Sequence, residues 1–281
     1  MFESSVALTP EQVEWLDECT EGTWQLNPRT GLVDVDGDFD CIEQGLSDFK
    51  GVLFGEVGGD FWCRNNQLSS LEGSPQKVGG GFNCQDNQLT TLKGAPKRVG
   101  RDFHCENNQL TSLEGAPREV RWDFNCNDNQ LTTLEGAPQV VGGGFYCKNN
   151  QLTSLKGAPQ EVRGNFRCGY NQLTTLEGAP REVGGYFNCQ SNQLTSLEGA
   201  PLEVGEDFIC NDNPVPKVTL ESIFRLMKKG ESYLKAVESI WTEIPVEDQT
   251  LLYRPEFEWV GADERRKLDA LRAYHGFKGM I

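Results

Sequence analysis

The amino-acid sequence predicts a repeat solenoid built on a single parallel β-sheet, and three observations lead to that fold class. Cysteines recur every 21 residues through the middle of the chain, in eight copies without an insertion or deletion. A phenylalanine precedes each cysteine by two residues, and an asparagine follows each by three. The chain of 281 residues is only 37% hydrophobic, which suits coils that each bury a thin core. The repeated cysteines are Cys63, Cys84, Cys105, Cys126, Cys147, Cys168, Cys189 and Cys210.

Each copy reads F-x-C-x-x-N-Q-L-T-[ST]-L-[EK]-G-A-P-x-x-V-x-x-x, with few departures. The F-x-C segment alternates with period two, which predicts a short strand with Phe and Cys on its inner side. In the second copy, Leu89, Leu92 and Val99 supply the other inward side chains, and Pro96 prevents an ordinary helix on the return path. We expect the strands to stack at roughly 4.8 Å per coil. We also expect each asparagine to bond turn backbone that has no sheet partner.

The spacing F-x-C-x-x-N-x-L-x-x-L resembles the leucine-rich repeat core L-x-L-x-x-N-x-L-x-x-L. The short unit, with proline nine residues after the asparagine, is most similar to the bacterial subclass found in Yersinia and Shigella effectors. The resemblance covers residues 58–213 and implies a parallel sheet. In the Shigella-type effectors a ubiquitin ligase domain with a catalytic cysteine follows the repeats. No cysteine follows Cys210 here, so that activity is not expected.

Two strings, QLTSLEGAP and the later EDQTLLYRPEFEWV, also resemble uncharacterised repeat proteins of large tailed bacteriophages. This second resemblance implies a biological setting and no particular activity. If the chain is encoded by a phage, we expect it to act in the host cytoplasm.

Solenoids need caps, because their terminal coils would otherwise expose core. At the N-terminus, residues 1–37 predict an acidic cap made of a helix and a hairpin. The helix is expected to start with Thr9 as N-cap, Pro10 at its first position and Gln12 at its third, and to end at Gly22. The hairpin is expected over residues 23–35, around the turn at 27–31.

Residues 38–57 form a degenerate first repeat, and the regular repeats occupy residues 58–213. In the degenerate copy, Phe39 and Cys41 stand for F-x-C, and the later apolar positions are Leu46, Phe49 and Val57. Residues 214–281 predict a small helical domain, with helices starting near 219, 232, 246 and 263. Whether that domain only caps the solenoid or binds a partner is left open.

The formal net charge is -16, and most of it lies at one end. Residues 1–57 hold 13 acidic residues against Arg29 and Lys50. This acidic end is either a solvated cap or a docking surface for a basic partner. Direct binding to nucleic acid is not expected, because phosphates need a positive stripe. The start of the chain does not look like a signal peptide, and no apolar run is long enough to span a membrane. These features predict a soluble, cytoplasmic protein that does not associate with a membrane.

Chemical motifs give no catalytic set, cofactor or metal site. The 21-residue spacing of the cysteines fits neither a disulfide framework nor a zinc site, and predicts buried, reduced thiols instead. The segment 34–38, Asp-Val-Asp-Gly-Asp, begins like a calcium loop. It fails because Phe39 takes the position of the loop glycine and Gly45 that of the closing glutamate, so we expect an acidic turn. The two histidines, His104 and His275, fit no triad, and we expect no enzyme.

Positions that the repeat leaves free should point out of the sheet, and several carry residue types common at interfaces. They predict a protein–protein interaction scaffold that uses the sheet face with help from the acidic cap. In a phage setting it would modulate or inhibit a host protein, such as a defence protein. The candidate residues are Trp62, Arg64, His104, Glu106, Tyr146, Lys148, Arg167, Tyr170 and Tyr186.

Three other functions remain open from the sequence. The first is a structural or assembly component of a virion, with the solenoid as spacer. The second is mimicry of nucleic acid by the N-terminal acids. The third is an enzyme in the helical domain, around Glu247, Asp248, Arg254, Glu256 and His275, although these residues also fit ordinary helix surfaces.

Overall fold

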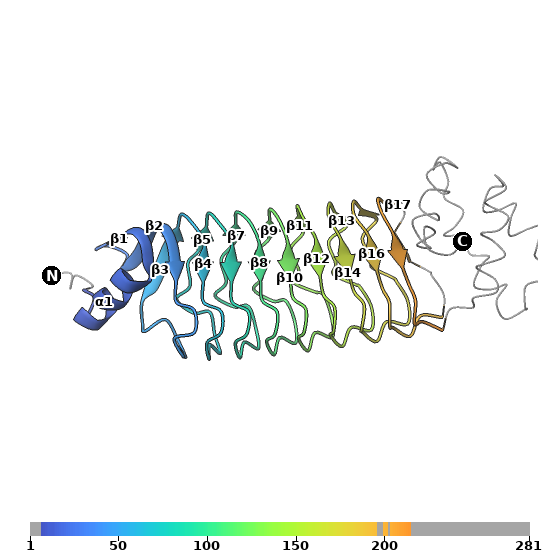
Figure 1. The fold of residues 1–281 in the computed structure, drawn as a ribbon, viewed down its shortest axis with the longest axis horizontal. Helices are drawn as coiled ribbons and strands as arrows, with labels where there is room; N and C mark the ends of the chain where they lie inside the picture. The colour runs from blue at the N-terminus through green and yellow to red at the C-terminus, as the bar shows by residue number, and fades with distance from the viewer. Residues whose placement is uncertain (1–6, 196–198, 202, 215–281) are drawn as a thin grey trace, which may run out of the picture.

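The structure is a computed structural model that describes residues 7–195, 199–201 and 203–214. In this part, the chain forms an elongated stack of coils that begins with one helix (Figure 1). The predicted helical domain, apart from Pro214, lies outside the described residues.

Helix α1 (Pro10–Cys19) begins as the sequence indicates. The Thr9 side chain accepts a hydrogen bond from the Gln12 amide, and the Gln12 side chain accepts one from the Thr9 amide, which completes a capping box. Trp15 and Leu16 are buried against the first coils. The prediction that Gly22 ends the helix is wrong: the helix ends at Cys19, and Gly22 lies within the next strand.

The hairpin joins β1 (Thr20–Leu26) and β2 (Leu32–Asp40), which pair antiparallel along their lengths. It starts three residues earlier than expected. Gly22 and Gly37 face each other with φ of 116° and 133°, and a Cβ on either would collide with a carbonyl of the opposite strand. Glycine at both positions therefore lets this strand pair close.

Strand β2 also begins the parallel stack. It pairs with β3 (Leu53–Val57) through its first half and with β4 (Phe61–Trp62) through Phe39 opposite Phe61. The expected acidic turn at 34–38 is therefore wrong, since these residues lie in the middle of a strand. The alternation of buried Val33 and Val35 with polar neighbours explains this, because it matches the period of a half-buried strand.

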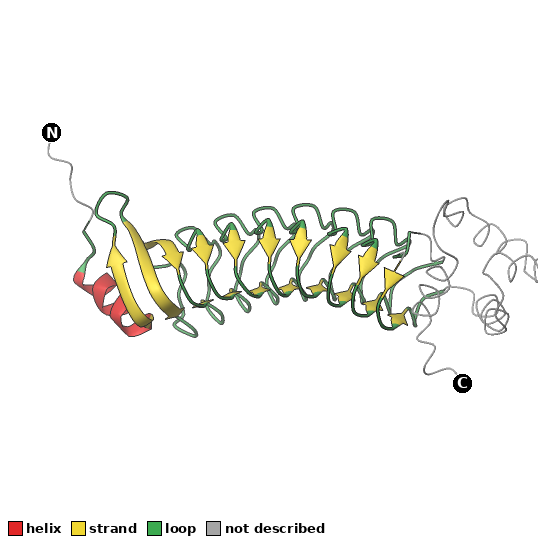
Figure 2. Ribbon diagram, turned by 90° about the horizontal axis from the view of Figure 1, so that it is seen from above, coloured by secondary structure: helices red, strands yellow, loops and turns green. Residues whose placement is uncertain are grey.

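Each regular coil before the last contributes two short strands where the sequence predicted one (Figure 2). One ladder contains the F-x dipeptides, and we call it the Phe ladder. The second contains the x-V dipeptides, and we call it the Val ladder. Both are parallel, and they join through β2 into one sheet. The Phe ladder contains β4 (Phe61–Trp62), β6 (Phe82–Asn83), β8 (Phe103–His104), β10 (Phe124–Asn125), β12 (Phe145–Tyr146), β14 (Phe166–Arg167), β16 (Phe187–Asn188) and β18 (Phe208–Ile209). The Val ladder contains β5 (Lys77–Val78), β7 (Arg98–Val99), β9 (Glu119–Val120), β11 (Val140–Val141), β13 (Glu161–Val162), β15 (Glu182–Val183) and β17 (Glu203–Val204).

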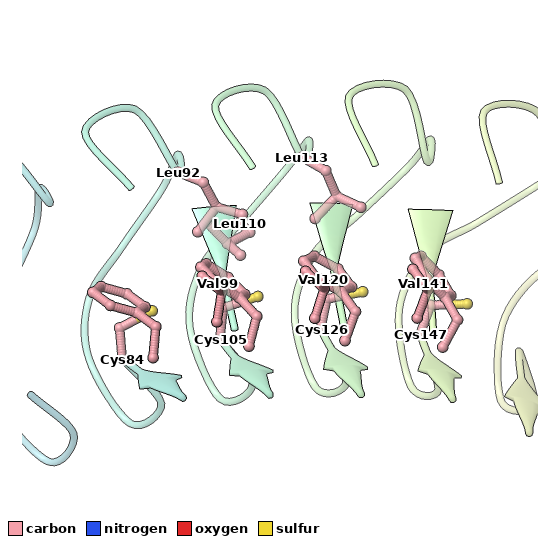
Figure 3. Close-up of a cluster of buried hydrophobic side chains, with 14 of the residues drawn as sticks. Cys84, Leu92, Val99, Cys105, Leu110, Leu113, Val120, Cys126, Val141 and Cys147 are labelled. Atoms are coloured by element: carbon pink, nitrogen blue, oxygen red, sulfur yellow. The ribbon is translucent and has the colours of Figure 1, made fainter. Parts of the chain in front are cut away.

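The core is a set of columns of identical side chains. Consecutive phenylalanines from Phe39 to Phe208 stack with ring centroids 5.0 to 5.5 Å apart and ring planes within 18° of parallel. Cysteine, leucine and valine columns lie beside them, as Figure 3 shows for four coils. The fixed repeat length produces these columns because a 21-residue period returns each position to the same place on the next coil.

A ladder of buried asparagines satisfies the backbone between strands, as the sequence predicted. Asn108 is typical: its side-chain amide donates to the carbonyls of Cys84, Cys105 and Glu106 at 3.0 to 3.2 Å. Its oxygen accepts the amide of Leu89 at 2.9 Å. Each asparagine thereby ties its own coil to the preceding one. The buried members are Asn66, Asn87, Asn108, Asn129, Asn150, Asn171 and Asn192, and the half-buried Asn213 ends the ladder.

Candidate partner-binding surface

The candidate residues all lie outside the core. Lys148, Arg167 and Tyr170 are exposed, and the other six are half-buried. They do not form one group, because the structure distributes them along the solenoid. Trp62 and Arg64 lie on the first regular coil, four coils away from Tyr146.

The densest group surrounds Arg167. Its guanidinium carbon lies 5.2 Å from the ring centre of Tyr146 and 4.9 Å from that of Tyr186. Among the described residues no carboxylate forms an ion pair with Arg167. Two cation–π contacts therefore hold an exposed guanidinium in place while its hydrogen-bond donors stay available.

Tyr146 is anchored at its far end. Its hydroxyl donates to Asp123 Oδ2 at 3.4 Å. Burial, followed by the Asp123 charge, raises the pKa of Tyr146, and Arg167 opposes that rise. The phenol therefore stays protonated and remains a hydrogen-bond donor across the physiological range.

A second cation–π pair, Lys148 and Tyr170, lies beside the group around Arg167. The Lys148 ammonium lies 4.9 Å from the ring centre of Tyr170. Tyr170 has a left-handed backbone with φ of 55°, and asparagine, aspartate or serine takes the equivalent position in the other regular coils. A bulky residue is unfavourable in that conformation. The strain makes Tyr170 a stronger candidate for function than its exposure alone would.

His104 and Glu106 form a separate group, two coils nearer the N-terminus than Tyr146. His104 Nδ1 lies 3.3 Å from Glu106 Oε1, but the contact is not aligned as a hydrogen bond, so it is an ion pair when the ring is protonated. Interaction with Glu106 raises the pKa of His104, and burial opposes the rise. On the sheet face, His104 and Glu106 therefore interact with each other.

The acidic end contains a groove of about 730 Å³ between the hairpin and β3. Trp24, Asp34, Asp36 and Glu56 are among the residues that line it. An aromatic ring beside three carboxylates is a chemical environment that suits a cationic side chain.

The cysteines behave as the sequence predicted. All ten are free; nine are buried, and Cys210 is half-buried. Burial raises the pKa of every one, and it reaches about 11 at Cys210. The thiols are therefore protonated and act as small apolar residues of the core.

Within the described part of the chain, no group of three His, Cys, Asp or Glu side chains is arranged to hold a metal ion. In the same residues, no helix has the length and apolar character needed to cross a membrane.

Sequence reasoning missed one exposed aromatic residue. Trp122 is 57% exposed, and the Arg101 guanidinium lies 6.0 Å from its ring centre. The corresponding position holds glycine in most coils, as at Gly80 and Gly143. That departure from the repeat was the available signal, but it lies beside the Val ladder, which the sequence did not reveal.

No protein-family model matches the sequence, and no curated protein matches it. Among solved structures, the chain is similar to YopM from Yersinia enterocolitica WA-314, at 20% identity and a TM-score of 0.43. The match covers 58% of this chain and 38% of that one. The parallel coils of 21 residues and the asparagine ladder are features of this chain itself, and they make it a leucine-rich-repeat-like solenoid.

Proposed function

We propose that this chain is a non-enzymatic protein–protein interaction scaffold. The observation that carries the proposal is the clamp of Arg167 between Tyr146 and Tyr186. Arginine and tyrosine dominate binding energy at protein interfaces when they are held rigidly. The two rings restrict the guanidinium before a partner arrives, so less side-chain entropy is lost on binding.

The partner proposed for this face offers a carboxylate to Arg167 and apolar surface to the flanking rings. Lys148 and Tyr170 repeat the same chemistry one row away. The acidic groove at Trp24 and Asp36 would take a basic region of the same partner. Opposite charges at these two surfaces would fix the direction in which that partner lies along the solenoid.

The phage-like strings in the sequence favour a bacterial host protein as the partner, in the host cytoplasm. The chain would then act by occupying a surface of that protein, for example of a defence protein. This role needs no chemistry beyond binding.

Affinity capture from a bacterial host lysate tests the proposal. The wild-type chain is compared with a variant carrying Tyr146→Ala, Arg167→Ala and Tyr186→Ala. A control variant carries Gln88→Ala, Gln109→Ala and Gln130→Ala, which are exposed on another side of the coils. We expect mass spectrometry to find a protein that the wild type and the control capture and the first variant does not. Identical captured proteins for all three would refute the face assignment. High abundance in purified virions would support the structural alternative.

A further inference from the structure

Trp122 stands at the corner between the Val and Phe ladders, at a position that the repeat normally leaves without a side chain. Five equivalent positions are glycine, namely Gly59, Gly80, Gly143, Gly164 and Gly185. Trp122 is the most exposed aromatic residue in the described part of the chain, at 57%. This coil therefore presents a largely exposed ring where most coils carry glycine.

Five cations lie in residues 97–101 and 118–121, two segments that stack on adjacent coils beside this tryptophan, and we call them the basic band. They are Lys97, Arg98, Arg101, Arg118 and Arg121. All five are exposed, and among the described residues only Arg101 has an ion pair, with Asp60 at 3.9 Å. The exposed acid within the band is Glu119, which lies next to Arg98 in the Val ladder. The band is thus a local excess of positive charge on a chain whose net charge is -16.

Two nearby aspartates are held in place by backbone amides, and their charges offset part of the band. Asp60 accepts the amide of Gly81 at 2.6 Å, and Asp102 accepts that of Asp123 at 2.9 Å. These hydrogen bonds fix each carboxylate along the stack, and among the described residues only Asp60 comes within ion-pair distance of the band, at Arg101.

The coil after Trp122 packs closely against the coil that carries it. Gly142 and Gly143 carry no side chain there, and the Gly143 amide bonds the Trp122 carbonyl at 2.9 Å. Val140 of the same coil is 57% exposed and pairs with Glu119 in the Val ladder. An exposed aromatic ring and an exposed valine on coils that also carry exposed arginines are residue types found at binding hot spots.

We propose that Trp122 and the basic band bind an acidic protein segment that carries a bulky apolar residue. The apolar residue packs on Trp122, and flanking carboxylates pair with Arg118 and Arg121. A nucleic acid fits less well, because stacking of successive bases needs several aromatic rings and this surface offers one.

The proposed site does not depend on the face around Arg167, although the two surfaces meet at Asp123. The test uses a fluorescein-labelled peptide of twelve residues, made of aspartate and glutamate with one central phenylalanine, and follows fluorescence anisotropy at physiological salt. One variant carries Trp122→Gly, which restores the usual residue of the repeat and is therefore expected to fold. A second carries Arg118→Glu and Arg121→Glu.

The matched control carries Arg181→Glu and Arg163→Glu. These two arginines occupy the same repeat positions as Arg118 and Arg121 on later coils, so net charge changes equally. We expect the first two variants to weaken peptide binding at least tenfold, and the control and the Tyr146, Arg167 and Tyr186 alanine variant to change it less than threefold. The proposal is overturned if the wild type does not bind the peptide, if the control loses as much affinity as the Arg118 and Arg121 variant, or if the Arg167 face variant abolishes binding. Tighter binding of a twelve-nucleotide oligothymidine than of the peptide would assign the surface to nucleic acid instead.

Discussion

The asparagine ladder makes a quantitative prediction about how neighbouring coils share stability. Replacing Asn108 with alanine leaves the buried Leu89 amide without its acceptor. The Cys84 carbonyl keeps the hydrogen bond from Asn87, and the Cys105 carbonyl keeps the one from Asn129. One orphaned donor, together with the lost bonds, should lower the free energy of unfolding by about 2 to 3 kcal/mol.

Removing two adjacent asparagines should cost more than the sum of the single changes. Asn108 and Asn129 both donate to the Cys105 carbonyl, so the double alanine variant removes both bonds to that buried group. We expect an additional loss of about 1 to 2 kcal/mol, the desolvation cost of an unsatisfied buried acceptor. Asn171 bonds the carbonyls of Cys147, Cys168 and Gly169, none of which Asn108 contacts. The Asn108 and Asn171 double variant is therefore the control, and it should be additive.

Urea unfolding followed by far-UV circular dichroism measures both double variants and their single changes. The slope of the transition shows whether the whole solenoid still unfolds together. If the adjacent pair is additive within about 0.5 kcal/mol, the shared carbonyl does not couple the coils and the reasoning fails.

Three further predictions follow from the strained tyrosine, the thiols and the histidine pair. Tyr170→Asn should raise the free energy of unfolding by about 0.5 to 1 kcal/mol, because asparagine tolerates the left-handed backbone better; a loss in urea unfolding would show that the cation–π contact outweighs the strain. Under native conditions at pH 8, a thiol reagent should modify Cys210 first and the nine buried cysteines far more slowly, while all ten should react at once in denaturant; rapid native modification of all ten would contradict the buried column. The raised pKa of His104 means that its pairing with Glu106 stabilises the fold fully below the ordinary value of 6.5 and that this contribution disappears as pH rises through the folded value. The thermal midpoint of a His104→Asn variant should therefore fall further below that of wild type at pH 5.5 than at pH 8.5, and an equal difference at both would refute the pairing.

Much of the coil could be predicted from the sequence, because a period without insertions places identical residues above one another. That reasoning correctly gave the inward columns, the buried thiols and the bonding role of the asparagines. It missed the Val ladder, because two residues with a single valine show no alternation that marks a strand. It also placed a turn inside β2, because three aspartates within five residues look like a loop until the strand partners on both sides are known.

The candidate surface was predictable only as a set of free positions. Tyr146 follows its phenylalanine, whereas Tyr186 precedes its own, so no shared repeat position relates them. Both rings contact Arg167 because the chain turns at each coil corner. This turn brings side chains from different repeat positions on neighbouring coils together. The same holds for Trp122 and the cations around it.

The sequence by itself therefore determined the coil: which side chains enter the core, which asparagines bond the backbone and which positions stay free. A period expresses those choices, and hydrophobic burial enforces them one coil at a time. Only the tertiary structure decided which free positions become neighbours. Which residues become neighbours depends on the path of the chain around each corner and on how the coils stack. Both are relations between different coils, so no single 21-residue unit contains them.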